Sequence, residues 1–394
     1  MPTLRGWAAL GASLALALLW VAFGEELLLA LAAFFLLAVI LGSLYVRRAG
    51  LNVGMSRVVT PIQVHDGDRA IVEVTMNSTR RLHEAVVEDV VHGLGAATFI
   101  ASRVRPEVPM VARYEVLCRP RGIYKLGPAT IKVHDPLDLA EFGLVAGRAD
   151  RLVVYPQIEE LDGLPTVRGQ DPNVNTASAS FSLTGGEDFF TLREYQQGDD
   201  LRRVHWPSSA KRDELMIKQL EMPWQSRALV LLDPRQENYR TPEAFEHAVR
   251  GAASAMAHLF RHGYSPTLWT GAPEVTAVTS ADSYAVAMEK LATVSTSKGL
   301  DLKAAVGRMR RSGMAGGALV LVTGTADDSH LAVYRTLGRD YVRTLLMSVT
   351  QKPNDVIMQF RGAGAVVVES ASTAKWAPAW HEAMERAWSS ATAG

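Results

Sequence analysis

The residues best suited to chemistry lie in one run, 186–206, where acids and arginines surround a single histidine. His205 is a candidate general acid or base because imidazole titrates near neutrality, and Asp199, Asp200 or Glu194 could assist it. A guanidinium fork matches a carboxylate or phosphate, so the arginines of the run are candidates for binding an anionic substrate. These arginines are Arg193, Arg202 and Arg203. One interpretation is therefore a hydrolase that uses His205 with Asp199.

The same run also has the composition of a segment that stabilises the fold through ion pairs. Its opposite charges are nearly matched, which leaves few arginines for a substrate. Gly198-Asp199-Asp200 is typical of a turn, and Tyr195 and Trp206 can seat the run on a sheet. Ser208 and Ser209 lack the sequence of a nucleophile elbow. We therefore predict a structural or docking role and assign no catalytic residue, with the hydrolase as the alternative.

The composition of the 394-residue chain argues against several classes of protein. Lys plus Arg and Asp plus Glu each number 41, and this balance disfavours a nucleic-acid partner. Cys118 is the only cysteine, so an intramolecular disulfide and a cysteine-rich metal site are excluded. No glycine-rich phosphate motif occurs, and we expect no cofactor and identify no small-molecule substrate.

Two uncharged apolar runs begin the chain, at about 7–23 and 27–46. Each is close to the roughly 20 residues that cross a bilayer, and the short acidic connector between them predicts a tight hairpin. A signal peptide is the alternative for the first run, but no small-x-small cleavage site follows it. The basic residues flanking the hairpin place both termini and the soluble domains in the cytoplasm of a multi-pass protein of the inner or plasma membrane. These flanking residues are Arg5, Arg47, Arg48 and Arg57.

The periodicity of the remaining chain changes twice. From 51 to 157 short alternating runs, such as 69–76, 112–118 and 130–133, are separated by turns. This pattern predicts an antiparallel β-sandwich of immunoglobulin-like type after the hairpin of residues 1–50. Residues 158–225 are predicted to be a linker that contains the charged run.

From 226 to 394 buried strands alternate with helices, which predicts a parallel sheet covered on both faces. The predicted strands are 228–233, 265–270, 318–323, 342–349 and 365–369. The predicted helices are 241–262, 283–294, 302–311, 329–337 and 378–389. Ligands bind such sheets beyond the carboxyl ends of the strands, where Asp233 and the loop 323–328 would lie.

Two side-chain patterns in this region have alternative interpretations. His258 and His262 lie four apart on the first helix, with His247 earlier, and this spacing could bind a metal ion. A partly exposed helix face is favoured instead. Trp380 and Trp388 belong to a stripe on the last helix, which we expect to pack on the sheet rather than form a groove for a partner.

The charged run and two upstream elements together resemble the bacterial family called domain of unknown function 58. Residues 119–128 and 135–139 are similar to its RG-x-Y-x-LGP and DP-x-GL elements, although Asp138 replaces a common glycine. The two apolar spans also fit, so the resemblance covers nearly the whole chain. The signature residues of the charged run are Arg193, Glu194, Tyr195, Gly198, Asp199, Asp200, Arg202, His205, Trp206, Ser209 and Ala210.

The resemblance implies a membrane anchor, a β-rich region and a von Willebrand A-like, Rossmann-like C-terminal domain. It also implies work beside a MoxR-type AAA+ ATPase in complex assembly or envelope maturation. The metal site of von Willebrand A domains requires D-x-S-x-S, whereas this chain has Asp233-Pro234-Arg235-Gln236-Glu237. Asp233 is therefore a degenerate remnant, Thr323 and Asp327 are further candidate remnants, and we expect no metal.

The predicted fold class is two transmembrane helices, an immunoglobulin-like antiparallel β-sandwich and a von Willebrand A-like α/β domain. The predicted function is a membrane-anchored, cytosol-facing scaffold or adaptor. It would present the α/β domain to a MoxR-type AAA+ ATPase or to a client protein complex. A channel or transporter is disfavoured because the two spans contain no ionisable residue.

Overall fold

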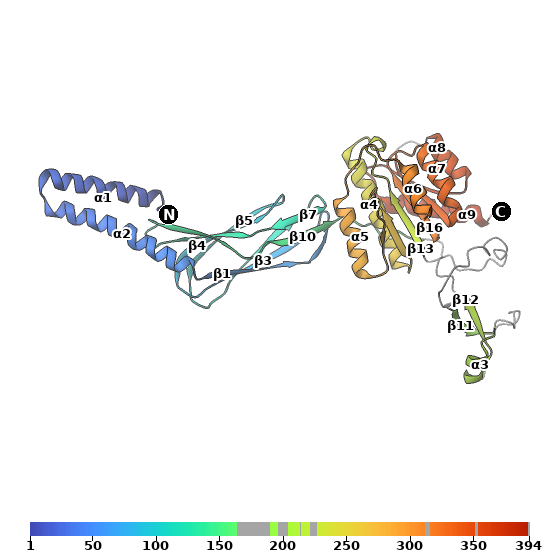
Figure 1. Cartoon of the computed structure of the whole chain (residues 1–394), viewed down its shortest axis with the longest axis horizontal. Helices are drawn as coiled ribbons and strands as arrows, with labels where there is room; N and C mark the ends of the chain where they lie inside the picture. The colour runs from blue at the N-terminus through green and yellow to red at the C-terminus, as the bar shows by residue number, and fades with distance from the viewer. Residues whose placement is uncertain are drawn as a thin grey trace. The chain divides into compact units, whose positions relative to one another are not determined.

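The computed structural model describes residues 1–163, 190–195, 204–212, 214–220, 227–311, 316–350 and 354–392. The chain divides into two units, Met1–Pro156 and Gln157–Gly394. The first unit contains a helical hairpin and two β-sheets, and the second contains an α/β sheet and a short strand pair (Figure 1).

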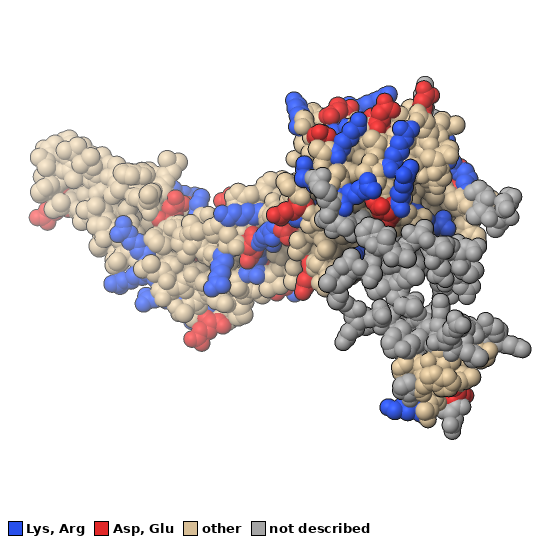
Figure 2. All heavy atoms as spheres, turned by 45° about the vertical axis from the view of Figure 1, so that its right-hand side comes forward, with Lys and Arg blue, Asp and Glu red and all other residues tan. Residues whose placement is uncertain are grey.

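The two predicted apolar spans are helices, α1 (Leu4–Phe23) and α2 (Glu26–Gly50), and both are long and apolar enough to cross a membrane. Gly24 ends α1 in the left-handed conformation, with φ of 74°, which makes the tight turn possible. Small side chains let the helices approach closely, and Ser13 Oγ donates to the Ala32 carbonyl at 2.7 Å. Large apolar side chains on the outer surface stay exposed, and Figure 2 shows most of the hairpin surface free of charged residues.

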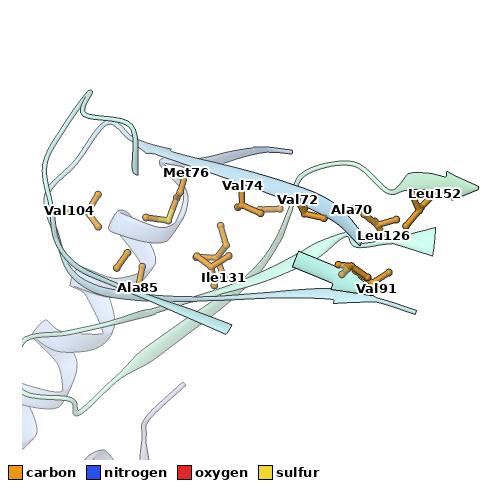
Figure 3. Close-up of a cluster of buried hydrophobic side chains, with 14 of the residues drawn as sticks. Ala70, Val72, Val74, Met76, Ala85, Val91, Val104, Leu126, Ile131 and Leu152 are labelled. Atoms are coloured by element: carbon orange, nitrogen blue, oxygen red, sulfur yellow. The ribbon is translucent and has the colours of Figure 1, made fainter. Parts of the chain in front are cut away.

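The β region consists of two sheets that enclose one apolar core (Figure 3). Alternating side chains along β3 and β4 fill this core because successive residues of a strand point to opposite faces. Every strand pair is antiparallel except β2 with β10. The first sheet has the order β1 (Val53–Thr60), β3 (Arg69–Ser78) and β6 (Met110–Leu117). The second has the order β2 (Gln63–His65), β10 (Asp150–Tyr155), β7 (Gly122–Leu126), β4 (Leu82–Val91), β8 (Ala129–His134) and β9 (Glu141–Ala146), with β5 (Gly95–Val104) beside β4.

An ion-pair network joins the two sheets at Arg57. Its Nε donates to Asp89 Oδ2 at 2.9 Å, its Nη1 donates to Asp150 Oδ2 at 2.9 Å, and the Tyr114 hydroxyl also donates to Asp89 Oδ2, at 2.7 Å. The Arg57 side chain is only 3% exposed, so its charge is engaged in these ion pairs inside the sandwich. Arg47 and Arg48 are the exposed basic residues at the end of α2.

The α/β unit has a six-stranded sheet with the order β15 (Thr276–Ala277), β14 (Ser265–Trp269), β13 (Arg227–Leu232), β16 (Gly316–Thr323), β17 (Tyr341–Val349) and β18 (Val366–Ser370). All neighbours are parallel except β14 with β15, and the five predicted strands are confirmed. The sequence missed β15 and α8 (Asp355–Gly362), because such short elements carry little periodicity.

Helices cover both faces of this sheet. The five predicted helices are confirmed as α4 (Pro242–Arg261), α5 (Ala281–Thr293), α6 (Leu302–Arg311), α7 (Asp328–Leu337) and α9 (Trp376–Thr392). Side chains of α6, α7 and α8 share one core with Leu229 and Leu231 of β13. Helix α4 packs against the same central strands. Trp376 of α9 donates from Nε1 to the carbonyl of His247, a residue of α4, at 2.8 Å.

Candidate functional site

The carboxyl edge of the central strands is where a sheet of this kind offers a ligand site. The chain leaves β13 toward α4 and β14, and it leaves the adjacent strand β16 toward α7 and β17. The two connections thus run to opposite sides, which makes the edge between β13 and β16 a topological switch point. Asp233 directly follows β13, and the 323–328 loop follows β16, as predicted.

Asp233 at this edge is fully buried and is surrounded by donors. Arg235 folds back onto it, with Nε 3.0 Å from Oδ1 and Nη2 3.0 Å from Oδ2. Asn238 Nδ2 donates to Oδ2 at 2.6 Å, and Thr323 Oγ1 lies 3.4 Å from the same oxygen. Both carboxylate oxygens are therefore engaged by side chains of this chain.

Asp327 and His330 complete the cluster from the start of α7. Asp327 is the N-cap of this helix, and Arg235 Nη1 lies 3.1 Å from its Oδ2. The buried His330 ring lies between the two acids, with Nε2 3.0 Å from Asp233 Oδ2 and Nδ1 2.8 Å from Asp327 Oδ1. One arginine and one histidine thus each contact both carboxylates. We call these four residues the Asp233 cluster.

The pKa values of the Asp233 cluster favour the charged forms. Burial opposes ionisation of Asp233, but hydrogen bonds from His330 and Arg235 outweigh it and lower the pKa to about 2. The same partners hold the pKa of Asp327 well below its ordinary value despite burial. Burial also opposes protonation of His330, whereas its hydrogen bonds to the two acids raise its pKa, although Arg235 Nη2 lies 3.5 Å away. Asp233 and Asp327 are therefore held in their anionic forms beside the Arg235 cation, and the raised pKa of His330 favours its protonated form.

This donor set does not fit a divalent metal ion. A metal at a von Willebrand A edge needs free carboxylate and hydroxyl oxygens, but Arg235 and His330 already occupy the carboxylates. Thr323 and Asp327, the candidate remnants, do lie at the cluster. Asp233 is equally unsuited to act as a general base, because its low pKa makes it a weak acceptor of protons. What the arrangement provides is an edge whose buried carboxylates are already paired within the chain.

Sequence reasoning found Asp233, Thr323 and Asp327 but missed the residues that close the site. Arg235 stands two positions after Asp233, where the metal motif has its first serine. That substitution was itself the available signal, because an arginine there can reach back to the carboxylate. His330 lies three positions after the N-cap Asp327, and this spacing brings the two side chains together in the first helical turn.

The histidines of α4 do not form the partly exposed face that we expected. His247 is 1% exposed and His258 is fully buried, so the prediction is wrong for both. The His247 ring stacks on Trp376 with centroids 4.6 Å apart, and the His258 ring lies 4.2 Å from that of His262. Burial and nearby cations lower the pKa values of His247 and His258 to about 4 each. In the part of the chain that the structure describes, no cluster of His, Cys, Asp and Glu could hold a metal ion.

The two tryptophans of the α9 stripe differ in burial. Trp380 is 1% exposed and its Nε1 donates to the carbonyl of Asp162 at 2.8 Å, as expected of a packed face. Trp388, two turns later, is 61% exposed. The stripe therefore packs only along its first half.

The described part of the signature is a strand pair with a short helix. Strand β11 (Phe190–Glu194), which carries Arg193 and Glu194, pairs with β12 (Met216–Leu220) in antiparallel register. Tyr195 continues this pairing, with its N–H donating to the Leu215 carbonyl at 2.8 Å. Gly198, Asp199, Asp200 and Arg202 lie outside the described residues.

His205 and Ser209 hold the short helix α3 (Trp206–Arg212) to β12. The His205 N–H donates to the Met216 carbonyl at 2.8 Å, and the Met216 N–H donates to Ser209 Oγ at 2.8 Å. Trp206 is 68% exposed and Ala210 is exposed, so neither is buried in the described part of the unit. His205 Nδ1 also lies 2.8 Å from Ser208 Oγ.

Comparison with known proteins gives one family and one curated relative. Residues 191–377 match the family described as "Protein of unknown function DUF58". The Bacillus subtilis (strain 168) protein described as "Uncharacterized protein YeaD" is 30% identical over 217 residues, which are 53% of this chain and 53% of that protein. The chain thus spans about half the length of this relative.

Solved structures are only distantly similar. A CARDB domain from Pyrococcus furiosus has a TM-score of 0.21 and 14% identity, and covers 27% of this chain and 94% of its own. The sporulation control protein Spo0M from Bacillus subtilis has a TM-score of 0.16 and 9% identity, and covers 26% of this chain and 49% of its own. Scores this low carry no argument about fold. The identified similarity is therefore to the DUF58 family, over a segment that includes the Asp233 cluster and the whole six-stranded sheet.

Proposed function

We propose that this protein is a membrane-anchored, cytosol-facing scaffold or adaptor. Its α/β unit, as a von Willebrand A-like domain, would be presented to a MoxR-type AAA+ ATPase or to a client complex. The β-sandwich, as an immunoglobulin-like domain, would act as the spacer. The two apolar helices support the membrane anchor, and Arg47 and Arg48 after the second helix support the cytosol-facing orientation. The family resemblance supports an ATPase as the partner.

The observation that carries the proposal is the closure of Asp233 by Arg235 and His330. At the switch point, where α/β enzymes bind substrates, this chain has carboxylates that its own cations already engage. An edge whose buried carboxylates are already paired within the chain suits recognition of a protein surface better than bond-making chemistry. Glu237, two residues after Arg235, and Asp328, the first residue of α7, are exposed, and both are available to a basic partner surface.

The test is capture of a purified MoxR-type ATPase by the full chain in detergent. Replacing both acids, Glu237→Lys with Asp328→Lys, is expected to reduce capture about tenfold or more, because it places positive charge on the proposed surface. Arg339→Glu, just before β17 and thus at the opposite edge of the sheet, is the control and is expected to capture normally. Equal capture by both variants, or no capture by the wild type, rejects the proposal.

A second candidate is a hydrolase, and the His205–Ser208 contact favours it. A histidine nitrogen 2.8 Å from a hydroxyl is the geometry of an activated nucleophile. The same contact is also explained as a polar interaction in the first turn of α3. Hydrolysis of a panel of activated esters distinguishes a hydrolase from a structural contact. A hydrolase requires that the wild type turns over an ester and that Ser208→Ala and His205→Ala each abolish this turnover without unfolding the protein.

A further inference from the structure

A pocket of about 490 Å³ opens beside the last turns of α2 in the first unit. One wall is the helix itself, with Leu41, Leu44 and Arg48. The other wall is the turn between β3 and β4, with Arg80 and Arg81. The pocket therefore joins an apolar wall to a basic one.

The helical wall is one continuous face of α2. Leu41, Leu44, Tyr45 and Arg48 are spaced by three or four residues, so their side chains lie along a single stripe. Leu41 and Leu44 are 55% and 43% exposed, respectively, and belong to the apolar span. Arg48 follows them where that span ends, so the stripe changes from apolar to basic within two turns.

Tyr45 holds the arginine-bearing turn against this helix. Its hydroxyl donates to the Arg81 carbonyl at 3.3 Å and accepts from the His83 N–H at 3.1 Å. The Ser78 hydroxyl also donates to the Arg80 carbonyl, at 2.8 Å. These bonds hold the backbone of the turn beside α2, so Arg80 and Arg81 follow one another next to the helix.

The charges of the pocket are uncompensated. Arg48, Arg80 and Arg81 are exposed, and none of them forms an ion pair with an acidic residue that the structure describes. The exposed arginines of β3 and β6 differ, because Arg69 pairs with Glu115 at 2.7 Å and Arg113 with Glu73 at 2.6 Å. Three guanidinium groups without an acidic partner among the described residues, beside an apolar stripe, match an anion that also has an apolar part.

We propose that this pocket binds the phosphate headgroup of an anionic phospholipid, with the acyl chains along Leu41 and Leu44. The guanidinium groups of Arg48, Arg80 and Arg81 donate to the phosphate oxygens, as arginine clusters beside membrane helices do. The inference rests on the proposed membrane anchor, because only an embedded α2 places Leu41 and Leu44 among acyl chains. A tyrosine at this level is typical of the membrane–water boundary.

Native mass spectrometry of the detergent-purified full chain tests the proposal with phosphatidylglycerol as the probe. The wild type is expected to bind one phosphatidylglycerol more tightly than phosphatidylcholine. Arg48→Gln is expected to weaken this binding about fivefold, the factor for one arginine near an anionic headgroup, and Arg80→Gln with Arg81→Gln is expected to weaken it further. Arg47→Gln is the matched control, since Arg47 is exposed beside Arg48 but does not line the pocket. A second control for the double variant is Arg335→Gln with Arg339→Gln, in the other unit.

Three results would overturn the proposal. Equal losses from Arg47→Gln and Arg48→Gln would mean general attraction to juxtamembrane charge. Equal binding of phosphatidylcholine would mean that the arginines do not select the lipid. Displacement of the lipid by millimolar inorganic phosphate would make a free anion the ligand. Alkaline extraction of membranes reports separately on the anchor: an extracted wild type refutes the proposed membrane function, whereas a retained protein without lipid selectivity refutes only this inference.

Discussion

Arg235 Nε lies 3.0 Å from Asp233 Oδ1, and this ion pair closes the carboxyl edge of the central strands. The two residues of the pair lie in one loop, two positions apart. Arg235 also contacts Asp327, which lies in the connection that follows β16. Arg235 thereby ties together the two loops that make the switch point. The stability of this edge is expected to depend on that guanidinium together with His330, which also contacts both carboxylates.

Replacement of Arg235 by Gln is expected to lower the free energy of unfolding of the α/β unit by about 3–5 kcal/mol, because it removes one of the two side chains that contact both acids of the Asp233 cluster. Urea unfolding followed by tryptophan fluorescence measures this, since Trp269, Trp376 and Trp380 are buried in the same unit. Arg339→Gln is the exposed control, with an expected change within about 0.5 kcal/mol. A loss no larger than that of the control would show that the ion pair is dispensable.

Magnesium is expected to leave the unfolding midpoint of the wild type unchanged. The carboxylate oxygens of Asp233 already accept hydrogen bonds from Arg235 and Asn238, so a cation would have to displace them. Thermal unfolding with millimolar magnesium and with a chelator measures this directly. A midpoint that rises with magnesium would contradict the closed site, because a ligand that binds only the folded state stabilises it.

The free energy of unfolding is expected to fall toward both alkaline and acid pH. These two sides of the profile, its alkaline and acid arms, are due to different histidines. The pKa of His330 is raised in the folded state, so its contribution is complete below about 6.5 and is lost as the pH rises through the folded value. The pKa of His258 is lowered to about 4, so its contribution is present above about 6.5 and is lost as the pH falls toward 4. The free energy of unfolding should therefore peak near pH 6.5.

Two substitutions separate these arms in urea titrations between about pH 4 and 9. His330→Gln should flatten the alkaline arm, and His258→Phe should flatten the acid arm while His247 retains part of it. An alkaline arm that persists in His330→Gln would assign it to another group.

Gly127→Ala is expected to destabilise the β region by about 1–3 kcal/mol, because this residue has φ of 63° and a Cβ would clash with Arg57 Nη2. The substitution would push the guanidinium away from Asp89. Gly143→Ala is the matched control, since a Cβ there meets nothing within 4 Å. Hydrogen exchange of β1 and β4 peptides reports on this region, which contains no tryptophan. Equal protection in both variants would refute the close-approach argument.

Trp380→Ala is expected to cost about 3–5 kcal/mol of unfolding free energy, whereas Trp388→Ala is expected to cost less than about 1 kcal/mol. Both residues lie on α9, but only the first is buried and bonded to the Asp162 carbonyl. Chemical denaturation of the two variants provides the comparison. Similar losses would indicate that Trp388 also packs.

Local sequence determined the elements of this protein. The uncharged runs at 7–23 and 27–46 are helices, the alternating runs at 69–76 and 130–133 are strands, and Thr241 caps the helix that it was predicted to begin. These features follow from side-chain periodicity and capping within a few residues. Asp138, which stands where the resembling DP-x-GL element has a glycine, has φ of 52° in the left-handed region.

The tertiary structure decided what those elements do together. The placement of Arg57 inside the sandwich, the burial of His258 against Trp380, and the contact of His330 with Asp233 all join segments distant in the sequence. A histidine or arginine looks the same in sequence whether it is exposed or ion-paired, because its environment depends on strand order and helix packing. For that reason the sequence predicted only that Asp233 lies at the carboxyl edge of the sheet, and the fold revealed that Arg235 and His330 contact it.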